Sequence, residues 1–267
     1  MNPNSDLDGS RGVSTWFDSH CHLHLCEEQE DASKVVADAR AAGVKSMLTV
    51  GIDVESSRRA AALAEQEGVV AAVGVHPNSA GEFDDVAAGA VAELLAFDQV
   101  VAVGETGLDF YRDACPEGLQ FEAFTAHIRL AKAHDLALVI HTRASVGRAL
   151  DLLEDLGAPD RLVFHCWSGD SDELTRALRL GAFISFAGNI SFPGAEPLRE
   201  AAASVPEERI LVETDSPFLT PVPHRGKPNR PALLPHVGAA LAHARGTEAE
   251  DLAALTSANA HRLFGLE

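Results

Sequence analysis

Residues 15–23 read TWFDSHCHL, which is a short run typical of a buried β-strand with polar side chains at its far end. Side chains two apart in a strand point to the same face, so Asp18, His20 and His22 are expected to project together. Two neutral imidazoles at the carboxyl end of a strand can bind one divalent transition metal. A histidine pair by itself is weak evidence for a metal site, so its meaning depends on which residues lie at the carboxyl ends of the later strands.

Apolar runs of strand length alternate with amphipathic stretches along the rest of the chain. The runs contain much Val, Ile and Ala with little polar alternation, which is typical of parallel strands buried on both faces. Eight strand–helix units in about 250 residues predict an α/β fold, a TIM (β/α)8 barrel. A doubly wound open sheet is the alternative, disfavoured because no glycine-rich dinucleotide fingerprint follows the first strand. The predicted strands are 15–23, 44–52, 69–77, 100–109, 136–143, 161–169, 182–188 and 210–219, and the predicted helices are 31–42, 55–67, 86–96, 119–134, 145–156, 171–180, 195–204 and 233–245.

The sequence predicts one domain that is preceded by a tail and ends in an extra helix. Residues 1–14 are polar and are expected to be a disordered tail, and residues 15–267 to form one barrel domain. The segment 248–264 predicts an extra C-terminal helix, with Thr247 as its N-cap and Gly265 as its stop.

Charge and cysteine usage narrow the class of protein. The formal net charge of −19 argues against general electrostatic attraction to nucleic acid or to anionic membranes. No segment approaches the roughly 18 apolar residues of a membrane span, so no membrane partner is expected. The four cysteines lack a Cys-x-x-Cys spacing, which indicates reduced thiols in a cytoplasmic protein. A monomer is the plainest expectation.

Imidazole or carboxylate side chains stand at the same end of six predicted strands. Catalytic groups of α/β barrels collect at the carboxyl ends of the strands, and such groups are costly within apolar runs unless they are paired or bind a metal. Any one of them could be a satisfied core residue, but their recurrence indicates a shared site. They are His20 and His22 after strand one, His76 after strand three, Glu105 in strand four, His141 after strand five, His165 after strand six, and Glu213 and Asp215 after strand eight.

Four histidines and two carboxylates are enough for two metal ions. The first ion would take His20, His22 and Asp215, and the second would take His141 and His165. Glu105 lies between these groups in barrel order, so a bridging role is expected. Two cations about 3.5–4 Å apart can deprotonate a shared water. The mixed ligand set suits zinc or manganese, does not exclude magnesium, and is compatible with a third ion.

Other residues near these strand ends have open roles. Glu213 shares a strand face with Asp215, so it could be a further ligand, a general base, or a partner that fixes a histidine tautomer. Asp215 is the first candidate for a residue that both binds metal and takes part in proton transfer. Glu105 and Glu213 are the other catalytic candidates. His76 would contact substrate or donate a hydrogen bond to a metal-bound carboxylate. His24 is expected to be a solvated loop histidine.

Together the motifs resemble those of the TatD family of metal-dependent deoxyribonucleases, within the amidohydrolase superfamily. The resemblance implies a TIM barrel, a divalent-metal cluster and hydrolysis of phosphodiester bonds in DNA. It carries the metal roles onto His20, His22, Glu105, His141, His165 and Asp215. Two departures are Asn229-Arg230-Pro231, where the family has Asn-Glu-Pro, and His24-Leu25, where it has an acidic residue after the first motif. The matching motifs are DSHCHL at 18–23, GVHP at 74–77, GETGLD at 104–109, VIHTR at 139–143, HCWSG at 165–169, ETDSPFL at 213–219 and ANAHRLF at 258–264.

The acidic balance is compatible with DNA as the substrate. An exonuclease binds only a strand end, and its metals supply local positive charge. Arg143 beside His141, and Arg225 in the loop after strand eight, are predicted to grip phosphate at the rim of the site. Hydrolysis of C–N or ester bonds, such as D-aminoacyl-tRNA deacylation, is the first alternative, because fold and metals do not separate these reactions. A non-catalytic metal-binding protein is the second.

Overall fold

The computed structural model describes residues 15–27 and 30–266, so the tail predicted over residues 1–14 lies outside the described residues. Short helices of the 3-10 type occur at Pro77–Glu82 (η1), Gly188–Ser191 (η2), Glu207–Arg209 (η3) and Pro231–Leu233 (η4). The strands are β1 (Trp16–Cys21), β2 (Val44–Val50), β3 (Val69–Val73), β4 (Val100–Asp109), β5 (Ala137–Arg143), β6 (Leu162–Phe164), β7 (Phe183–Phe186) and β8 (Ile210–Val212). The α-helices are α1 (Leu23–Cys26), α2 (Ala32–Ala41), α3 (Val54–Leu63), α4 (Asp85–Leu94), α5 (Glu117–His134), α6 (Val146–Leu156), α7 (Ser171–Arg179), α8 (Glu196–Ser204), α9 (Leu234–Arg245) and α10 (Ala249–Phe264).

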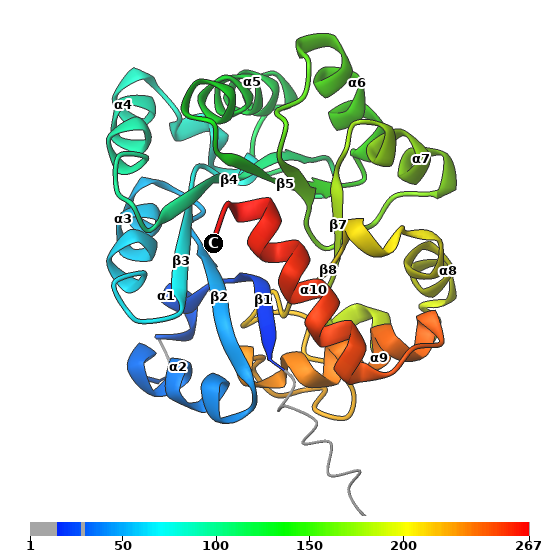
Figure 1. Ribbon diagram of the computed structural model, residues 1–267. Coiled ribbons are helices and arrows are strands. Elements are labelled where there is room, and N and C mark those ends of the chain that lie inside the picture. Colours follow the sequence, from blue (N-terminus) through cyan, green and yellow to red (C-terminus); the bar gives the residue numbers. More distant parts are fainter. Residues whose placement is uncertain (1–14, 28–29, 267) are drawn as a thin grey trace, which may run out of the picture.

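The described strands form one parallel sheet in the order β1 to β8, with helices around its outer face (Figure 1). A parallel bridge between Cys21 and Ser216 joins the end of β1 to the segment after β8, so the sheet closes into a barrel. Strands buried on both faces need no polar alternation, which is why their sequences are nearly continuous apolar runs. The predicted TIM (β/α)8 barrel is confirmed.

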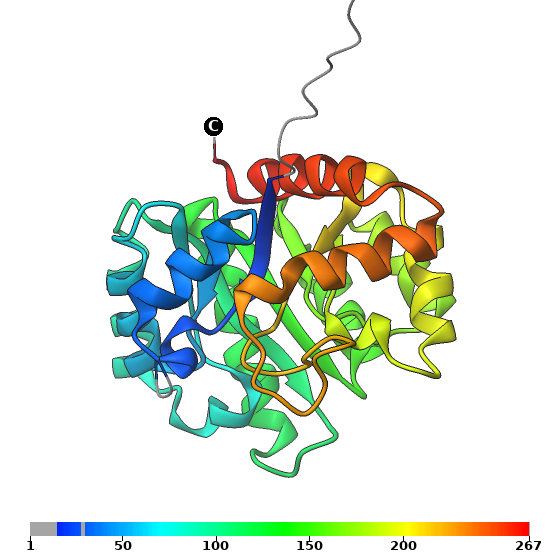
Figure 2. The same ribbon diagram turned by 90° about the horizontal axis from the view of Figure 1, so that it is seen from below.

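The last helix, α10, lies across the amino end of the barrel (Figure 2). Its residues Ala260, Leu263 and Phe264 pack with Phe17 and other apolar side chains of the barrel interior. The predicted C-terminal helix is thus confirmed, and Gly265 ends it with a φ of 66°. The predicted N-cap is wrong: Glu248 precedes the helix, because the Thr247 backbone N–H bonds to the Ala242 carbonyl and completes the end of α9.

Several strands end earlier than predicted, because their polar residues leave the ladder, whereas β4 and β5 end at the predicted residues. Strand eight was expected over 210–219, yet β8 ends at Val212, and β6 ends at Phe164. Beyond these ends Asp215 has a φ of 53° and Cys166 a φ of 46°, a left-handed backbone that no strand continues through. The predicted ligands of these two strands therefore lie on the first residues of loops.

The one-turn helix α1 was not predicted, and it changes the position of His24. The His24 side chain is half-buried in α1, and its ring packs edge-on against that of His22, with centroids 5.7 Å apart. Neither ring nitrogen has a hydrogen-bond partner, and burial lowers the pKa of His24 to about 4. The prediction of a solvated loop histidine is therefore wrong. None of the helices in the described part of the chain is long and apolar enough to cross a membrane.

Candidate metal centre

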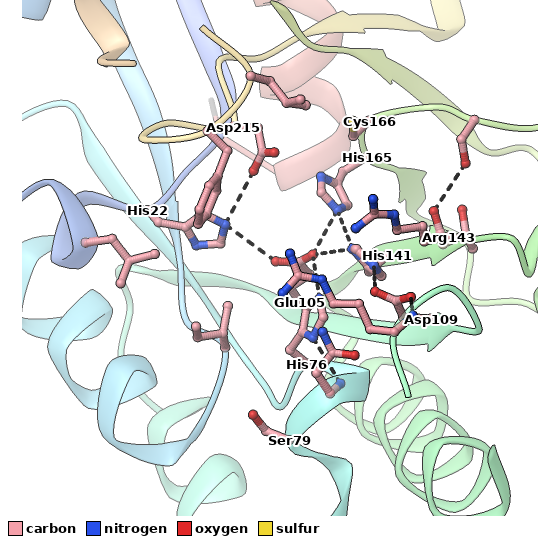
Figure 3. A pocket seen from close by; sticks show the side chains of 18 of the residues that line it. His22, His76, Ser79, Glu105, Asp109, His141, Arg143, His165, Cys166 and Asp215 are labelled. Carbon is pink, nitrogen blue, oxygen red and sulfur yellow. Dashed lines mark hydrogen bonds and ion pairs between the residues drawn. The ribbon is translucent and has the colours of Figure 1, made fainter. Parts of the chain in front are cut away.

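A cavity of about 690 Å³ opens at the carboxyl ends of the strands (Figure 3). The barrel packs its apolar side chains toward the other end, so the polar groups that follow the strands gather here. The predicted residues found in the cavity wall are His22, His76, Glu105, His141, Arg143, His165 and Asp215. His20 lies beneath the wall and is fully buried.

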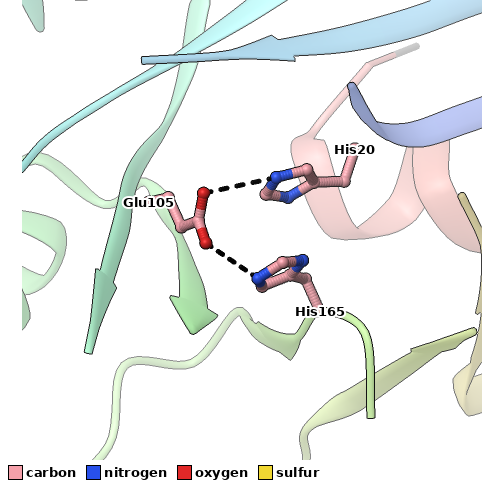
Figure 4. A group of neighbouring side chains, drawn as sticks. All are labelled: His20, Glu105 and His165. Atoms are coloured by element: carbon pink, nitrogen blue, oxygen red, sulfur yellow. Dashed lines mark ion pairs between the residues drawn. The ribbon is translucent and has the colours of Figure 1, made fainter. Parts of the chain in front are cut away.

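Glu105 stands between two groups of histidines. Its Oε2 lies 3.5 Å from Nε2 of His20 and 3.6 Å from Nε2 of His22. Its Oε1 lies 2.8 Å from Nδ1 of His141 and 2.9 Å from Nε2 of His165. Figure 4 shows the two oxygens turned toward His20 and His165. A carboxylate that offers one oxygen to each group has the arrangement needed to bridge two cations.

Two glycines in β4 allow this approach. Gly104 and Gly107 have φ values of 138° and 141°, which side chains rarely adopt. A Cβ on Gly104 would lie 2.5 Å from the Val139 carbonyl oxygen, and one on Gly107 would clash with the His141 carbonyl. Glycine at both positions therefore lets β4 lie against β5, so that Glu105 reaches His141.

The donor atoms lie close enough together to bind a metal ion in common. Nε2 of His20 and Nε2 of His22 are 3.2 Å apart, and Nδ1 of His141 is 3.2 Å from Nε2 of His165. Asp215 adds an Oδ1 that is 3.5 Å from Nε2 of His22. Imidazole and carboxylate donors together suit zinc, manganese or a similar divalent ion. Three groups have all donor atoms within 4.8 Å of one another: His20 with His22 and Asp215, His20 with Glu105 and His165, and His76 with Glu105 and His141.

The charge state of the site also favours cations. Burial by itself would raise the pKa of Glu105, but the neighbouring His165, His76 and His141 hold it well below its usual value. Burial opposes protonation of His165, yet Glu105 and Glu213 outweigh it and hold the pKa of His165 well above its usual value. Glu105 is therefore an ionised, buried carboxylate that needs a positive partner. Metal ions would replace the histidine protons in that role, since a ligating imidazole is neutral.

A second set of contacts orients the histidines. Glu213 is fully buried behind His165, with Oε1 3.2 Å from Nδ1 of that ring. The Nδ1 of His22 lies 2.9 Å from the Val50 carbonyl oxygen, to which it donates, so that Nε2 is left as the ligand atom. Of the three roles open for Glu213, this placement favours fixing the tautomer of His165, because Glu213 does not line the cavity.

Asp109 is a site residue that the sequence reasoning missed. Its Oδ2 lies 3.4 Å from Nε2 of His141. Burial by itself would raise the pKa of Asp109, but the contact with His141 outweighs it and lowers that pKa to about 2. A signal was present, because Glu105, Gly107 and Asp109 alternate along β4 and so share one face. Asp18, which shares the period of His20 and His22, accepts hydrogen bonds from the backbone and hydroxyl of Thr214.

The predicted phosphate-binding residues differ in placement. Arg143 lines the cavity, with its guanidinium carbon 3.8 Å from the centroid of the Tyr111 ring. Arg225 is exposed and is not part of the cavity wall; its guanidinium carbon lies 3.7 Å from the centroid of Phe192. Arg230, at the position where the TatD pattern has an acid, is 3.2 Å from Glu30.

Comparison with known proteins places the chain in a family. Residues 17–265 match the family model described as TatD related DNase. The chain is 42% identical to the uncharacterized metal-dependent hydrolase TatD of Mycobacterium tuberculosis, covering 93% of this chain and 97% of that protein. It is 38% identical to the 3'-5' ssDNA/RNA exonuclease TatD of Klebsiella pneumoniae, covering 94% and 98%.

A solved structure agrees with these matches. The crystal structure of YJJV, a TatD homolog from Escherichia coli, superposes with a TM-score of 0.90 at 30% identity, covering 96% of this chain and all of that one. The matches run through every strand and reach α10, so they cover the whole barrel and its cavity. This chain is therefore a metal-dependent hydrolase that belongs to the TatD-related DNase family.

Proposed function

We propose that this protein is a nuclease that hydrolyses phosphodiester bonds of DNA, and that it works from the ends of single strands. The observation that carries the proposal is Glu105, whose two oxygens face two separate histidine groups in the wall of an open cavity. A site for two cations suits the attack of water on a phosphodiester. The Klebsiella pneumoniae relative is named a 3'-5' ssDNA/RNA exonuclease, which supports the same substrate class.

Within this proposal the residues hold two ions and place the phosphate. His20, His22 and Asp215 would hold one ion, His141 and His165 the other, and Glu105 would touch both. Bound there, two divalent cations would lower the pKa of a water molecule and neutralise charge on the phosphoryl oxygens. The group His76, Glu105 and His141 leaves a place for a third ion.

Three side chains have further roles in the proposed reaction. Asp215 lines the cavity, and its pKa is lowered because His22 and His20 outweigh the effect of burial, so it is ionised and can accept a proton from the attacking water. Arg143 in the cavity wall would bind a non-bridging phosphate oxygen as a charged donor. Glu213 would keep His165 in the tautomer that presents Nε2 to the ion.

The experiment is a gel assay with end-labelled DNA, single-stranded and duplex, in the presence of Mg²⁺, Mn²⁺ or Zn²⁺, beside the Asp215→Asn variant. We expect metal-dependent shortening of the single strand from one end, absent in the variant. A D-aminoacyl-tRNA and a cyclic amide serve as parallel substrates. Hydrolysis of either of these with intact DNA would replace the nuclease by the C–N or ester hydrolase. No hydrolysis of any substrate by metal-loaded protein would support a metal-binding protein without catalysis.

We also propose that the protein acts in the cytoplasm as a monomer. All four cysteines carry free thiols, and three of them are buried, which fits a reducing compartment. Size-exclusion chromatography with light scattering tests the monomer, and a stable dimer at low concentration would contradict it.

A further inference from the structure

Exposed aromatic side chains are few in the described part of the chain, and two of them adjoin the cavity: Phe218 lines it, and Tyr111 lies against the cavity residue Arg143. Tyr111 follows β4 and is 68% exposed, while Phe218 follows β8 and is 52% exposed. In a closed barrel of eight strands β4 and β8 face each other, so the two rings belong to opposite sides of the mouth. The third exposed aromatic, Phe97, precedes β4 and so lies at the amino end of the barrel.

The backbone of Phe218 is held by hydrogen bonds, although about half of the residue is exposed. The Phe218 N–H donates to the Asp215 carbonyl (2.8 Å), and the Asn229 side chain donates to the Phe218 carbonyl (2.6 Å). The ring contacts the edge of the candidate ligand His22, with centroids 6.0 Å apart, and lines the cavity. Phe218 thus presents an apolar surface next to the candidate metal centre.

Tyr111 has a comparable support on the other side. Its N–H donates to Oδ1 of Asp109 at 3.0 Å, and the Arg143 guanidinium covers one face of its ring. The large exposure of the ring leaves its remaining surface accessible to a ligand. Arg143 itself lines the cavity, so the ring and a phosphate-binding cation are adjacent.

These rings bear on how a protein of net charge −19 can bind a polyanion. Contacts from Lys and Arg to phosphates lose strength when the rest of the protein repels the strand. Stacking of a base on an aromatic ring does not depend on net charge, and every base has a face that can stack. In a duplex these faces are already covered by neighbouring bases, whereas an unpaired strand can offer them.

We propose that Phe218 and Tyr111 are stacking surfaces for unpaired bases, one on each side of the phosphate that lies in the cavity. The ligand is a single-stranded nucleic acid, and its phosphate between the two bases lies within reach of Arg143. This inference rests on the proposed nuclease function and adds how the strand is recognised. Stacking does not read the 2'-hydroxyl, so the same surfaces take DNA or RNA.

The test measures binding in the Asp215→Asn background, where the strand is not cleaved. The probes are a short single-stranded oligodeoxynucleotide that contains one 2-aminopurine, the matched oligoribonucleotide, and the duplex. Stacking quenches 2-aminopurine fluorescence, so the signal reports the contact itself. Phe218→Ala and Tyr111→Ala are compared with Phe218→Trp and with Phe97→Ala, a control with similar exposure at the far end of the barrel.

We expect quenching with both single strands and little with the duplex. Phe218→Ala should weaken single-strand binding about 5- to 150-fold and remove the quenching, and the loss should persist at high salt. Phe218→Trp should restore both, and Phe97→Ala should change neither. Binding by Phe218→Ala and Tyr111→Ala within about twofold of the parent would overturn the inference while leaving the nuclease proposal intact. A parent protein that neither binds nor cleaves single strands would overturn both.

Discussion

Oε1 of Glu213 lies 3.2 Å from Nδ1 of His165 and also accepts the Cys166 N–H at 2.9 Å, although Glu213 is fully buried. The contact directs Nε2 of His165 toward Glu105. Replacing such a partner commonly costs 10- to 100-fold in metal affinity. We therefore expect Glu213→Gln to weaken metal binding by roughly that factor, as measured by titration with Mn²⁺ or Zn²⁺.

The same variant separates two roles of Glu213. If Glu213 positions His165, turnover of Glu213→Gln should recover when the metal concentration is raised. Turnover that stays abolished in fully metal-loaded protein would instead assign Glu213 as a general base.

Asp215→Asn should lower turnover by roughly 100-fold or more while leaving the fold intact, because in the proposed mechanism it removes both a charged metal ligand and a proton acceptor. Asp215 is at the cavity surface, so no apolar packing is lost. Steady-state kinetics with a single-stranded oligonucleotide measures the effect, and circular dichroism checks the fold. Near-normal activity with metal present would reject the role of Asp215.

Arg225→Ala should raise KM for DNA more than it lowers turnover of a small phosphodiester. Arg225 lies outside the cavity wall, so it can reach a long strand but not a small diester. Arg209→Ala is the matched control, because its guanidinium also lies over a phenylalanine ring (Phe183), next to the amino end of β8. Equal effects of Arg225→Ala on both substrates would exclude a role in binding the strand.

Metal removal should destabilise the protein. Ions that bind only the folded state add about 2.7 kcal/mol of stability at a free concentration of 100 times Kd. The buried, ionised Glu105 also loses its cationic partners when the ions leave, unless His165 takes up a proton. We expect Tm to fall in a chelator and to recover with Mn²⁺ or Zn²⁺. A Tm that does not respond to either would argue against a metal site built into the fold.

His127 should make the stability pH-dependent. It is fully buried in α5, its Nε2 accepts the Val75 N–H, and burial lowers its pKa to about 4. The unfolded chain binds this proton near pH 6.5. Stability from this group is therefore complete above about pH 6.5 and lost as the pH falls toward 4. Between pH 7 and pH 5 the loss is about 2 kcal/mol.

Denaturant unfolding of the parent and of His127→Gln at both pH values measures this effect. The parent should lose about 2 kcal/mol more than the variant over the interval. Equal losses in the two proteins would show that His127 is not the group responsible.

Much of the fold and site followed from local patterns. The buried strands could be read from their apolar runs, and the shared placement of His141, His165 and Glu105 followed from the rule that parallel strands end at one edge. The details that failed depend on neighbours far away in sequence. The N–H of Thr247 is used by α9, and the half-buried position of His24 depends on the one-turn helix α1.

Some contacts around the candidate ligands were not predicted. The strand over 100–109 was predicted correctly, but the contact of Asp109 with His141 depends on how closely Gly107 of β4 packs on β5. Arg225 was predicted to bind phosphate as part of the basic loop after strand eight, and that role stays a prediction. What the loop sequence does not indicate is the packing of its guanidinium on Phe192, a contact between separate segments.

The helix α10 closes the barrel at the end opposite the cavity, and apolar side chains fill the space between them. The cavity is thus closed toward α10 and opens at the carboxyl ends of the strands. For the proposed exonuclease, a strand cannot pass through the barrel, so the strand and the released nucleotide occupy the same open side of the molecule. The free mononucleotide should therefore compete with the strand for the cavity and inhibit the enzyme competitively.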